Sequence, residues 1–372
     1  MSPQPTISRR GRLKGFRVDT RRLYEMSFSV TVKPSGRTFT VDSDETVLAA
    51  ALRHGLNLPY GCKNGACGTC KGRIVEGSVE LGPHQLSALS AQEEASGLCL
   101  FCSATPQSDL VIESREVQGA GEIPIRKMPC RVARIERPAP DVAILHLQLP
   151  ANERLQYLAG QYLEFILKDG KRRSYSIANA PHSDGPLQLH VRHMAGGVFT
   201  DQVFGAGAAP MKERDILRFE GPMGTFFLRE DSDKPIILLA SGTGFAPIKA
   251  IAEHLFDRGV ERRVVLYWGA RTRRDLYMHE LPVQWAAQHT WFRYVPVLSE
   301  ALAEDAWTGR TGLVHRAVME DIPDLSGHQV YACGVPVMVD AARRDFTTAC
   351  RLPPEEFYAD AFTSEADKPP AA

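Results

Sequence analysis

The feature that most constrains this sequence is a cysteine-rich stretch in its first third. Five of the eight cysteines are clustered there, and the other three are scattered. The clustered ones are Cys62, Cys67, Cys70, Cys99 and Cys102. A disulfide framework belongs to small secreted chains, whereas clustered thiols in a chain of 372 residues indicate metal binding or catalysis.

The segment 61–70 reads GCKNGACGTC, so three cysteines follow C-x4-C-x2-C, and Cys102 comes after 31 intervening residues. This is the spacing of a plant-type [2Fe–2S] site. Three glycines in the loop permit the positive φ angles that a tight turn around a cluster needs. They also expose backbone N–H groups that can bond to the cluster sulfurs. A structural zinc site is the alternative, but its cysteines usually come as paired short spacings.

Residues 27–117 resemble the plant-type ferredoxins along their whole length, from PYGCKNGACGTCKGRIVEGSVE to the tail CSATPQSDLVIE. The resemblance implies a β-grasp domain. In that family the fourth ligand directly precedes such a tail, which selects Cys102 and leaves Cys99 as a small buried residue. The gap before Cys102 is slightly longer than usual, which lengthens a surface loop. The metal ligands implied in this way are Cys62, Cys67, Cys70 and Cys102.

Closely spaced β-like runs between residues 128 and 229 predict an antiparallel β-barrel. Within it, RSYSIAN resembles the RxYSxxN flavin motif of the ferredoxin–NADP reductase superfamily, which implies bound FAD. By that resemblance Arg173 pairs with the flavin pyrophosphate as a bidentate donor. Tyr175 packs beside the isoalloxazine or the ribityl chain, and Ser176 hydrogen-bonds the flavin edge near N5. The alternative is a barrel that binds no flavin.

A glycine pair in the same barrel, within HVRHMAGGVFT, resembles the second phosphate loop of this superfamily. Small residues there open a helix, and the free N–H groups at a helix N-terminus bind anions well. The residues assigned to the cofactor on this basis are Gly196, Gly197, Val198 and Thr200.

From residue 230 onward, buried-strand runs alternate with helical stretches, which predicts a parallel α/β domain. The segment SGTGFAP follows the strand PIILLA, and its glycines allow close approach of a pyrophosphate to a helix N-terminus. Together with YWGAR and YACGVPVM it resembles the pyridine-nucleotide domain of the same superfamily. The nucleotide-binding residues implied by that resemblance are Gly242, Thr243, Gly244, Arg271, Cys333 and Gly334.

Three residues are expected at the point of hydride transfer. The resemblance places Ser176 at the flavin edge, Cys333 near the nicotinamide, and Phe362 where relatives place an aromatic ring over the flavin. Two alternatives stay open: Cys333 as a buried structural cysteine, and Phe362 as an ordinary core residue.

The segment boundaries follow from changes in pattern. Residues 1–25 carry seven basic residues without apolar periodicity, so they are predicted to be a disordered and dispensable extension. A ferredoxin domain at 26–117, a linker at 118–127, the FAD barrel at 128–229 and the NAD(P) domain at 230–372 follow. The expected fold is thus multidomain, α+β and α/β.

Composition excludes several other classes. The 44 Lys and Arg balance 44 Asp and Glu, which argues against a nucleic-acid partner. No apolar run is long enough to span a membrane. The basic start of the chain lacks the apolar core of a secretory signal. A soluble, cytoplasmic protein is therefore expected.

The three modules together predict electron flow from NAD(P)H through FAD to [2Fe–2S] and then to a partner protein. From residue 26 to about 363 the chain resembles the CDP-6-deoxy-L-threo-D-glycero-4-hexulose-3-dehydrase reductase family, also called CDP-6-deoxy-Δ3,4-glucoseen reductases. Stretches such as QYLAGQYLEFIL and WTGRTGLVH carry this likeness. It implies a pyridoxamine-phosphate-dependent sugar dehydrase as electron acceptor. The alternative is the reductase component of an aromatic-ring or di-iron oxygenase, since the module order is the same. A cluster-bearing scaffold is a third class, and it would leave the flavin and nucleotide motifs without use.

The choice between NADH and NADPH stays open. Arg271, Arg273 and Arg274 offer positive charge to a 2′-phosphate, whereas Asp275 beside them would repel it.

Overall fold

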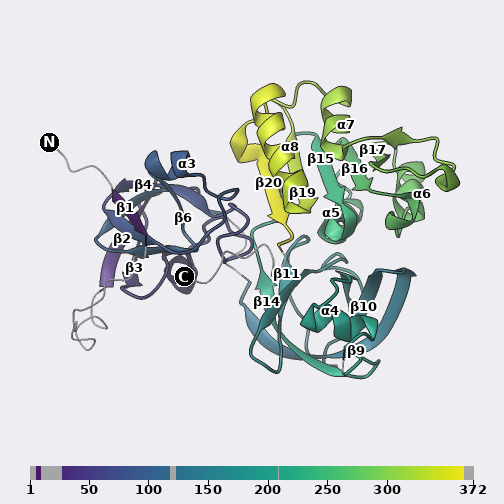
Figure 1. Cartoon of the computed structure of the whole chain (residues 1–372), viewed down its shortest axis with the longest axis horizontal. Helices are drawn as coiled ribbons and strands as arrows, with labels where there is room; N and C mark the ends of the chain where they lie inside the picture. The colour runs from purple at the N-terminus through teal and green to yellow at the C-terminus, as the bar shows by residue number, and fades with distance from the viewer. Residues whose placement is uncertain (1–5, 10–26, 118–122, 208, 364–372) are drawn as a thin grey trace. The chain divides into compact units, whose positions relative to one another are not determined.

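The computed structural model describes residues 6–9, 27–117, 123–207 and 209–363 (Figure 1). The chain divides into two compact units, one of residues 1–122 with 362–372 and one of residues 123–361. Each unit is described by itself.

The first unit has a mixed five-stranded sheet with the strand order β3-β2-β8-β4-β6. Its strands are β2 (Ser27–Lys33), β3 (Thr38–Asp42), β4 (Lys71–Glu76), β6 (Leu98–Leu100) and β8 (Leu110–Glu113). The neighbours β2 and β8 run parallel, and the other pairs are antiparallel. Helix α2 (Val47–Arg53) buries Val47, Leu48, Ala50 and Ala51 in the same core as these strands. This is the expected β-grasp arrangement.

A second, three-stranded sheet of this unit has the order β1-β5-β7, with β1 at Thr6–Arg9, β5 at Ser78–Leu81 and β7 at Ala104–Pro106. Strand β1 pairs in parallel with β5. The prediction that residues 1–25 are disordered is therefore wrong at Thr6–Arg9, because the open edge of β5 offers a backbone ladder to an extended segment. Residues 1–5 and 10–25 lie outside the described residues.

The second unit begins with a six-stranded antiparallel sheet of order β12-β11-β14-β9-β10-β13. The strands are β9 (Arg126–Ala139), β10 (Val142–Gln148), β11 (Tyr162–Ile166), β12 (Arg172–Ser176), β13 (Leu187–Arg192) and β14 (Ile216–Met223). A bridge between Ile177 and Leu189 joins the two outer strands and closes the barrel. Strand β9 begins inside the predicted linker 118–127, of which residues 118–122 lie outside the described residues.

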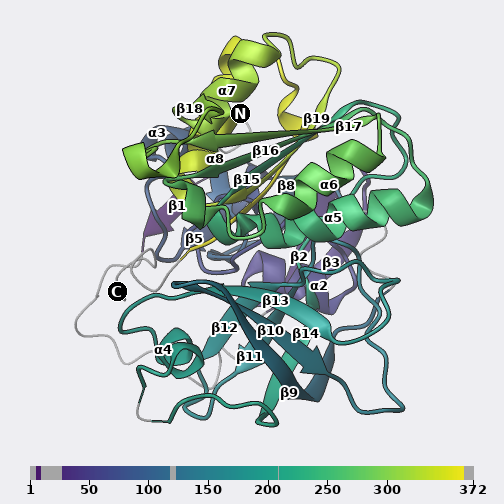
Figure 2. The same ribbon diagram turned by 90° about the vertical axis from the view of Figure 1, so that its right-hand side faces the viewer.

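The remainder of this unit is a six-stranded, wholly parallel sheet of order β18-β17-β16-β15-β19-β20. Its strands are β15 (Ile236–Ser241), β16 (Val264–Ala270), β17 (Phe292–Leu298), β18 (Arg310–Thr311), β19 (Gln329–Gly334) and β20 (Phe357–Ala361). Helices α5 (Phe245–Arg258) and α6 (Glu280–Gln288) lie on one side of the sheet, and α7 (Val314–Asp321) and α8 (Pro336–Ala349) on the other (Figure 2). Cover on both faces explains why the central strands are almost entirely apolar.

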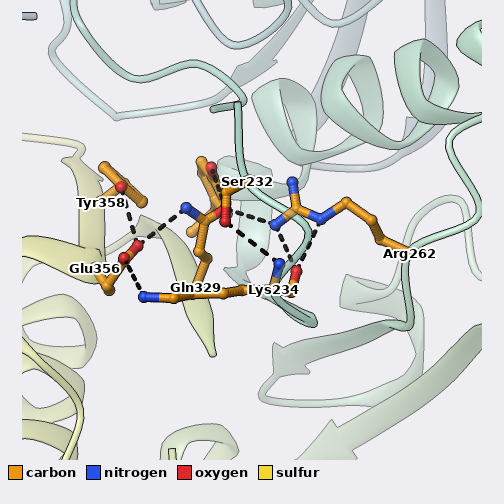
Figure 3. Close-up of polar contacts among 7 residues, drawn as sticks. Ser232, Lys234, Arg262, Gln329, Glu356 and Tyr358 are labelled. Atoms are coloured by element: carbon orange, nitrogen blue, oxygen red, sulfur yellow. Dashed lines mark hydrogen bonds and ion pairs between the residues drawn. The ribbon is translucent and has the colours of Figure 1, made fainter. Parts of the chain in front are cut away.

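A polar network secures the point where the barrel passes into the parallel sheet (Figure 3). The buried guanidinium of Arg262 donates to the carbonyl oxygens of Arg229 and Lys234, at 3.1 and 2.8 Å, and to Gln329 Oε1 at 2.7 Å. Glu356 accepts from Lys234 Nζ at 2.6 Å and from Gln329 Nε2 at 3.0 Å. A buried guanidinium needs such partners because its desolvation is costly. The network thus fixes the amino ends of β15, β19 and β20.

None of the helices in the described ranges is both long enough and apolar enough to cross a lipid bilayer.

Candidate functional site

The backbone of the cysteine loop in the first unit requires glycine at position 65 and directs N–H groups toward two of the sulfurs. Gly65 has φ +79°, and a Cβ there would lie 2.7 Å from the carbonyl oxygen of Pro83, so only glycine fits. The Gly65 N–H donates to Cys102 Sγ at 3.3 Å, and the Cys62 N–H donates to Cys67 Sγ at 3.4 Å. Backbone N–H groups therefore point at the sulfurs, as a site for anionic thiolates requires.

The four predicted ligands come together as two pairs of thiols. Cys62 hydrogen-bonds to Cys67, which lowers the pKa of the Cys67 thiol to about 6 and raises the pKa of Cys62. Cys70 hydrogen-bonds to Cys102, and this contact together with burial raises the pKa of Cys70. Within the described residues, no three His, Cys, Asp or Glu side chains are arranged to hold a single metal ion. Two pairs of thiols fit a cluster of two irons, with two thiolates for each iron.

Cys99 lies apart from these pairs. It sits in β6 opposite Gly72 of β4, is fully buried in the apolar core, and burial raises its thiol pKa. A neutral thiol in an apolar core behaves as a small hydrophobic side chain. Cys99 therefore has the environment of a structural cysteine.

In the second unit, the three residues of the flavin motif lie on β12. The Tyr175 ring packs 6.0 Å from the Phe165 ring and 5.1 Å from the Phe199 ring, and burial raises the pKa of Tyr175. Ser176 is buried at the end of the strand, and the Arg173 guanidinium donates to the carbonyl oxygen of Arg172 at 2.8 Å. Through Phe199, the tyrosine connects this motif to the second predicted phosphate loop.

That second loop precedes helix α4 (Val198–Phe204). Gly196 has φ +82°, and Gly197 is the N-cap of α4. The buried Thr200 hydroxyl donates to the carbonyl oxygen of Met194 at 2.8 Å. Thr200 therefore shapes the loop from inside, whereas Val198 is 43% exposed on its surface.

The nucleotide turn joins β15 to α5 through a single 3-10 turn at Gly242–Gly244. A Cβ on Gly244 would lie 2.2 Å from the carbonyl oxygen of Cys333, and a Cβ on Gly334 would lie 2.1 Å from Ser241 Oγ. The turn and the end of β19 thus approach each other so closely that both positions require glycine. Thr243 is buried at the centre of the turn.

Cys333 and Phe362, both expected at the hydride-transfer point, lie at the ends of β19 and β20. Cys333 is fully buried, and burial raises the pKa of its thiol well above the usual value, so the thiol is neutral. Phe362 follows β20 directly and is half-buried, but the second compact unit ends at Ala361.

The side chain of Asp275 turns inward rather than toward solvent. Its Oδ2 accepts from the Thr272 N–H at 3.0 Å and from the Thr272 hydroxyl at 3.1 Å. Arg271 is largely exposed, with Nε 3.9 Å from the same oxygen. Thr272 and Asp275 therefore form a capping box, and the Asp275 carboxylate is buried beside Arg271.

One residue near the nucleotide turn was missed by the sequence reasoning. The Arg192 guanidinium at the end of β13 lies against Gly242, where a Cβ would be 3.6 Å from Nη2. Its Nη1 donates to Asp141 Oδ2 at 2.8 Å, and its buried Nη2 has no hydrogen-bond partner among the described residues. Its only sequence signal is its place within HVRHMAGGVFT, shortly before the second phosphate loop.

Three family models match the chain in the order of its modules. The 2Fe-2S iron-sulfur cluster binding domain matches residues 30–107. The oxidoreductase FAD-binding domain matches residues 129–228, and the oxidoreductase NAD-binding domain matches residues 238–344. The protein therefore has a [2Fe–2S] domain, an FAD domain and an NAD(P) domain.

Relatives match over nearly the full length. The CDP-6-deoxy-L-threo-D-glycero-4-hexulose-3-dehydrase reductase of Yersinia pseudotuberculosis is 42% identical, over 91% of this chain and 99% of that protein. The phenol hydroxylase P5 protein of Acinetobacter pittii is 35% identical, over 92% of this chain and 96% of that protein. The crystal structure of Amycolatopsis cytochrome P450 reductase GcoB has a TM-score of 0.72 and 36% identity, and covers 91% of this chain and 99% of that one.

Electron transfer from NAD(P)H through FAD and [2Fe–2S] is thus the chemistry of this chain. The chain belongs to the ferredoxin–NADP reductase superfamily, in the family of iron–sulfur flavoprotein reductases that includes the CDP-6-deoxy-L-threo-D-glycero-4-hexulose-3-dehydrase reductases.

Proposed function

We propose that this reductase delivers single electrons to a pyridoxamine-phosphate-dependent sugar dehydrase that removes the C-3 hydroxyl of a nucleotide-linked hexulose. The observation that carries the proposal is the 42% identity to the Yersinia dehydrase reductase, compared with 35% for the phenol hydroxylase component. The second candidate partner is an aromatic-ring or di-iron oxygenase. NADH or NADPH supplies the electrons.

The proposed site divides into three groups of residues. Cys62, Cys67, Cys70 and Cys102 hold the cluster. Arg173, Tyr175, Ser176, Gly196, Gly197, Val198 and Thr200 position the FAD. Gly242, Thr243, Gly244, Arg271, Cys333 and Gly334 position the nicotinamide nucleotide. The FAD converts the two-electron hydride into the single electrons that a [2Fe–2S] centre accepts.

Arg192 joins the nucleotide group. Its buried, unpartnered Nη2 lies against Gly242 of the nucleotide turn, so an anionic oxygen at that turn would complete its hydrogen bonding. Asp141 holds the guanidinium in place through Nη1. A buried donor without a partner beside a phosphate-binding turn is typical of a residue whose partner is the ligand.

The proposed setting is the cytoplasm, because the four cysteine thiols must stay reduced until the cluster is assembled.

The partner assignment is tested by reconstitution. The purified reductase is combined with NADH and either the CDP-4-keto-6-deoxyhexose dehydrase with its substrate, or a phenol hydroxylase oxygenase with phenol. We expect formation of the 3-deoxy sugar product at a rate far above that of the oxygenase reaction. Cytochrome c reduction is measured in each mixture to establish that the reductase is active. Turnover of the oxygenase without turnover of the dehydrase would refute the proposed partner.

A further inference from the structure

A buried lysine lies near the start of helix α5. Lys249 is 5% exposed, although lysine is rarely found in a protein interior. Its Nζ donates to the Ala178 carbonyl oxygen at 3.1 Å and to Gln188 Oε1 at 3.4 Å, and it pairs with Glu253 Oε1 at 2.6 Å. The three ammonium hydrogens therefore have three acceptors, which offsets the cost of burying the charge.

The partner carboxylate also reaches the barrel. Glu253 Oε2 accepts the Ala180 N–H at 3.3 Å. Lys249 and Glu253 are one helical turn apart, so together they hold both ends of the short segment 178–180. The Tyr157 hydroxyl, also in the barrel, lies 3.0 Å from the carbonyl oxygens of both Asn179 and Ala180. The segment is thus held from both sides.

The Lys249–Glu253 ion pair joins helix α5 to the segment that follows the flavin motif. Only Ile177 separates segment 178–180 from Ser176 of the flavin motif, so contacts to this segment hold the chain directly beyond the end of β12. Helix α5 begins directly after the nucleotide turn, and Lys249 lies only about 7.5 Å along the helix axis from Gly244. The first turns of helix α5 therefore connect the nucleotide turn to the end of strand β12, which carries the flavin motif.

Stability alone does not account for an ion pair at this place, in which the lysine is buried and the glutamate is half-buried. Replacing such a pair by apolar side chains is often neutral or stabilising, so a pair that fixes a geometry is the better explanation. A second polar contact crosses the same boundary, since His190 Nδ1 of β13 lies 2.8 Å from the Tyr277 hydroxyl. Burial, the nearby Lys249 charge and His146 lower the pKa of His190, so that imidazole is neutral.

We infer that Lys249 and Glu253 form a clamp that sets the distance between the flavin and the nicotinamide for hydride transfer. Both are positioning residues, because they act through the flavin strand and the nucleotide turn rather than on the reacting atoms. The inference rests on the proposed roles of Ser176 and of the turn Gly242–Gly244. Misplacement by about 1 Å can cost a reaction about 100-fold in rate, so a clamp of this kind has a measurable effect.

The test compares Lys249→Met with a matched control, Lys234→Met. The control removes an ion pair of equal length, Lys234 Nζ to Glu356 Oε1 at 2.6 Å, at the amino end of the sheet. In FAD-loaded protein, stopped-flow reduction of the flavin by saturating NADH is expected to slow by about 10- to 100-fold in Lys249→Met and less than about twofold in the control. The isotope effect with deuterated NADH should rise, while NADH affinity and electron transfer from chemically reduced flavin to cytochrome c should stay unchanged.

A second readout needs no turnover. Hydrogen exchange of segment 178–180, measured without NADH, should accelerate in Lys249→Met and in Glu253→Gln but not in Lys234→Met. Glu253→Gln keeps the shape of the side chain, and it decides the matter if Lys249→Met does not fold. Unchanged hydride-transfer rates and unchanged exchange in the folded variants would overturn the clamp. Wild-type protein whose flavin NADH does not reduce would instead refute the proposed roles on which the clamp rests.

Discussion

Replacing Cys62 with serine is expected to reduce cytochrome c reduction by NADH to near background while most NADH–ferricyanide activity remains. Cys62 pairs with Cys67 in the loop, and serine cannot supply the thiolate that an iron requires. Cytochrome c takes its electrons from the cluster, whereas ferricyanide accepts them directly from the flavin. Both activities are measured per bound FAD in steady-state assays.

Cys350→Ser is the control, because Cys350 is a buried cysteine in the second unit, outside the cluster loop. This variant should keep both activities. If Cys62→Ser lost both activities together while FAD stayed bound, the order of electron transfer from flavin to cluster would be wrong.

The second large effect is expected at Cys102. Cys102→Ala removes the sulfur that accepts the Gly65 N–H and pairs with Cys70, so the cluster should be lost or distorted. Cys99→Ala removes only a buried sulfur from the apolar core, at a cost on the order of 1 kcal/mol in unfolding free energy. The visible absorption and the EPR signal of the reduced protein are compared in the two variants. A cluster that survives in Cys102→Ala and disappears in Cys99→Ala would show that the wrong cysteine was chosen.

The parts of the site that lie close together in sequence could be predicted. The spacing of Cys62, Cys67 and Cys70 and the glycine at 242, which has a positive φ, reflect local turns, whose geometry is set by a few neighbouring residues. The alternation of strands and helices beyond residue 230 likewise indicates a parallel sheet, because strands covered on both faces must be apolar throughout.

Contacts between distant segments could not be predicted. Arg192 and Gly242 are brought together only when β13 meets the nucleotide turn, and Lys249 meets Ala178 across 71 residues. The inward turn of Asp275 depends on a capping box that competes with exposure to solvent. Strand β1 was missed because its partner β5 lies far along the chain, and a basic segment without periodicity gives no sign of such pairing.

The central claim, that electrons pass from nicotinamide to flavin and only then to the cluster, is tested most directly by anaerobic rapid mixing with NADH. Flavin bleaching is followed by absorbance, and cluster reduction is followed by EPR of rapidly frozen samples. The account predicts that the flavin is reduced first, that the cluster signal follows, and that protein stripped of FAD shows no cluster reduction. Reduction of the cluster by NADH in the FAD-free protein would contradict it.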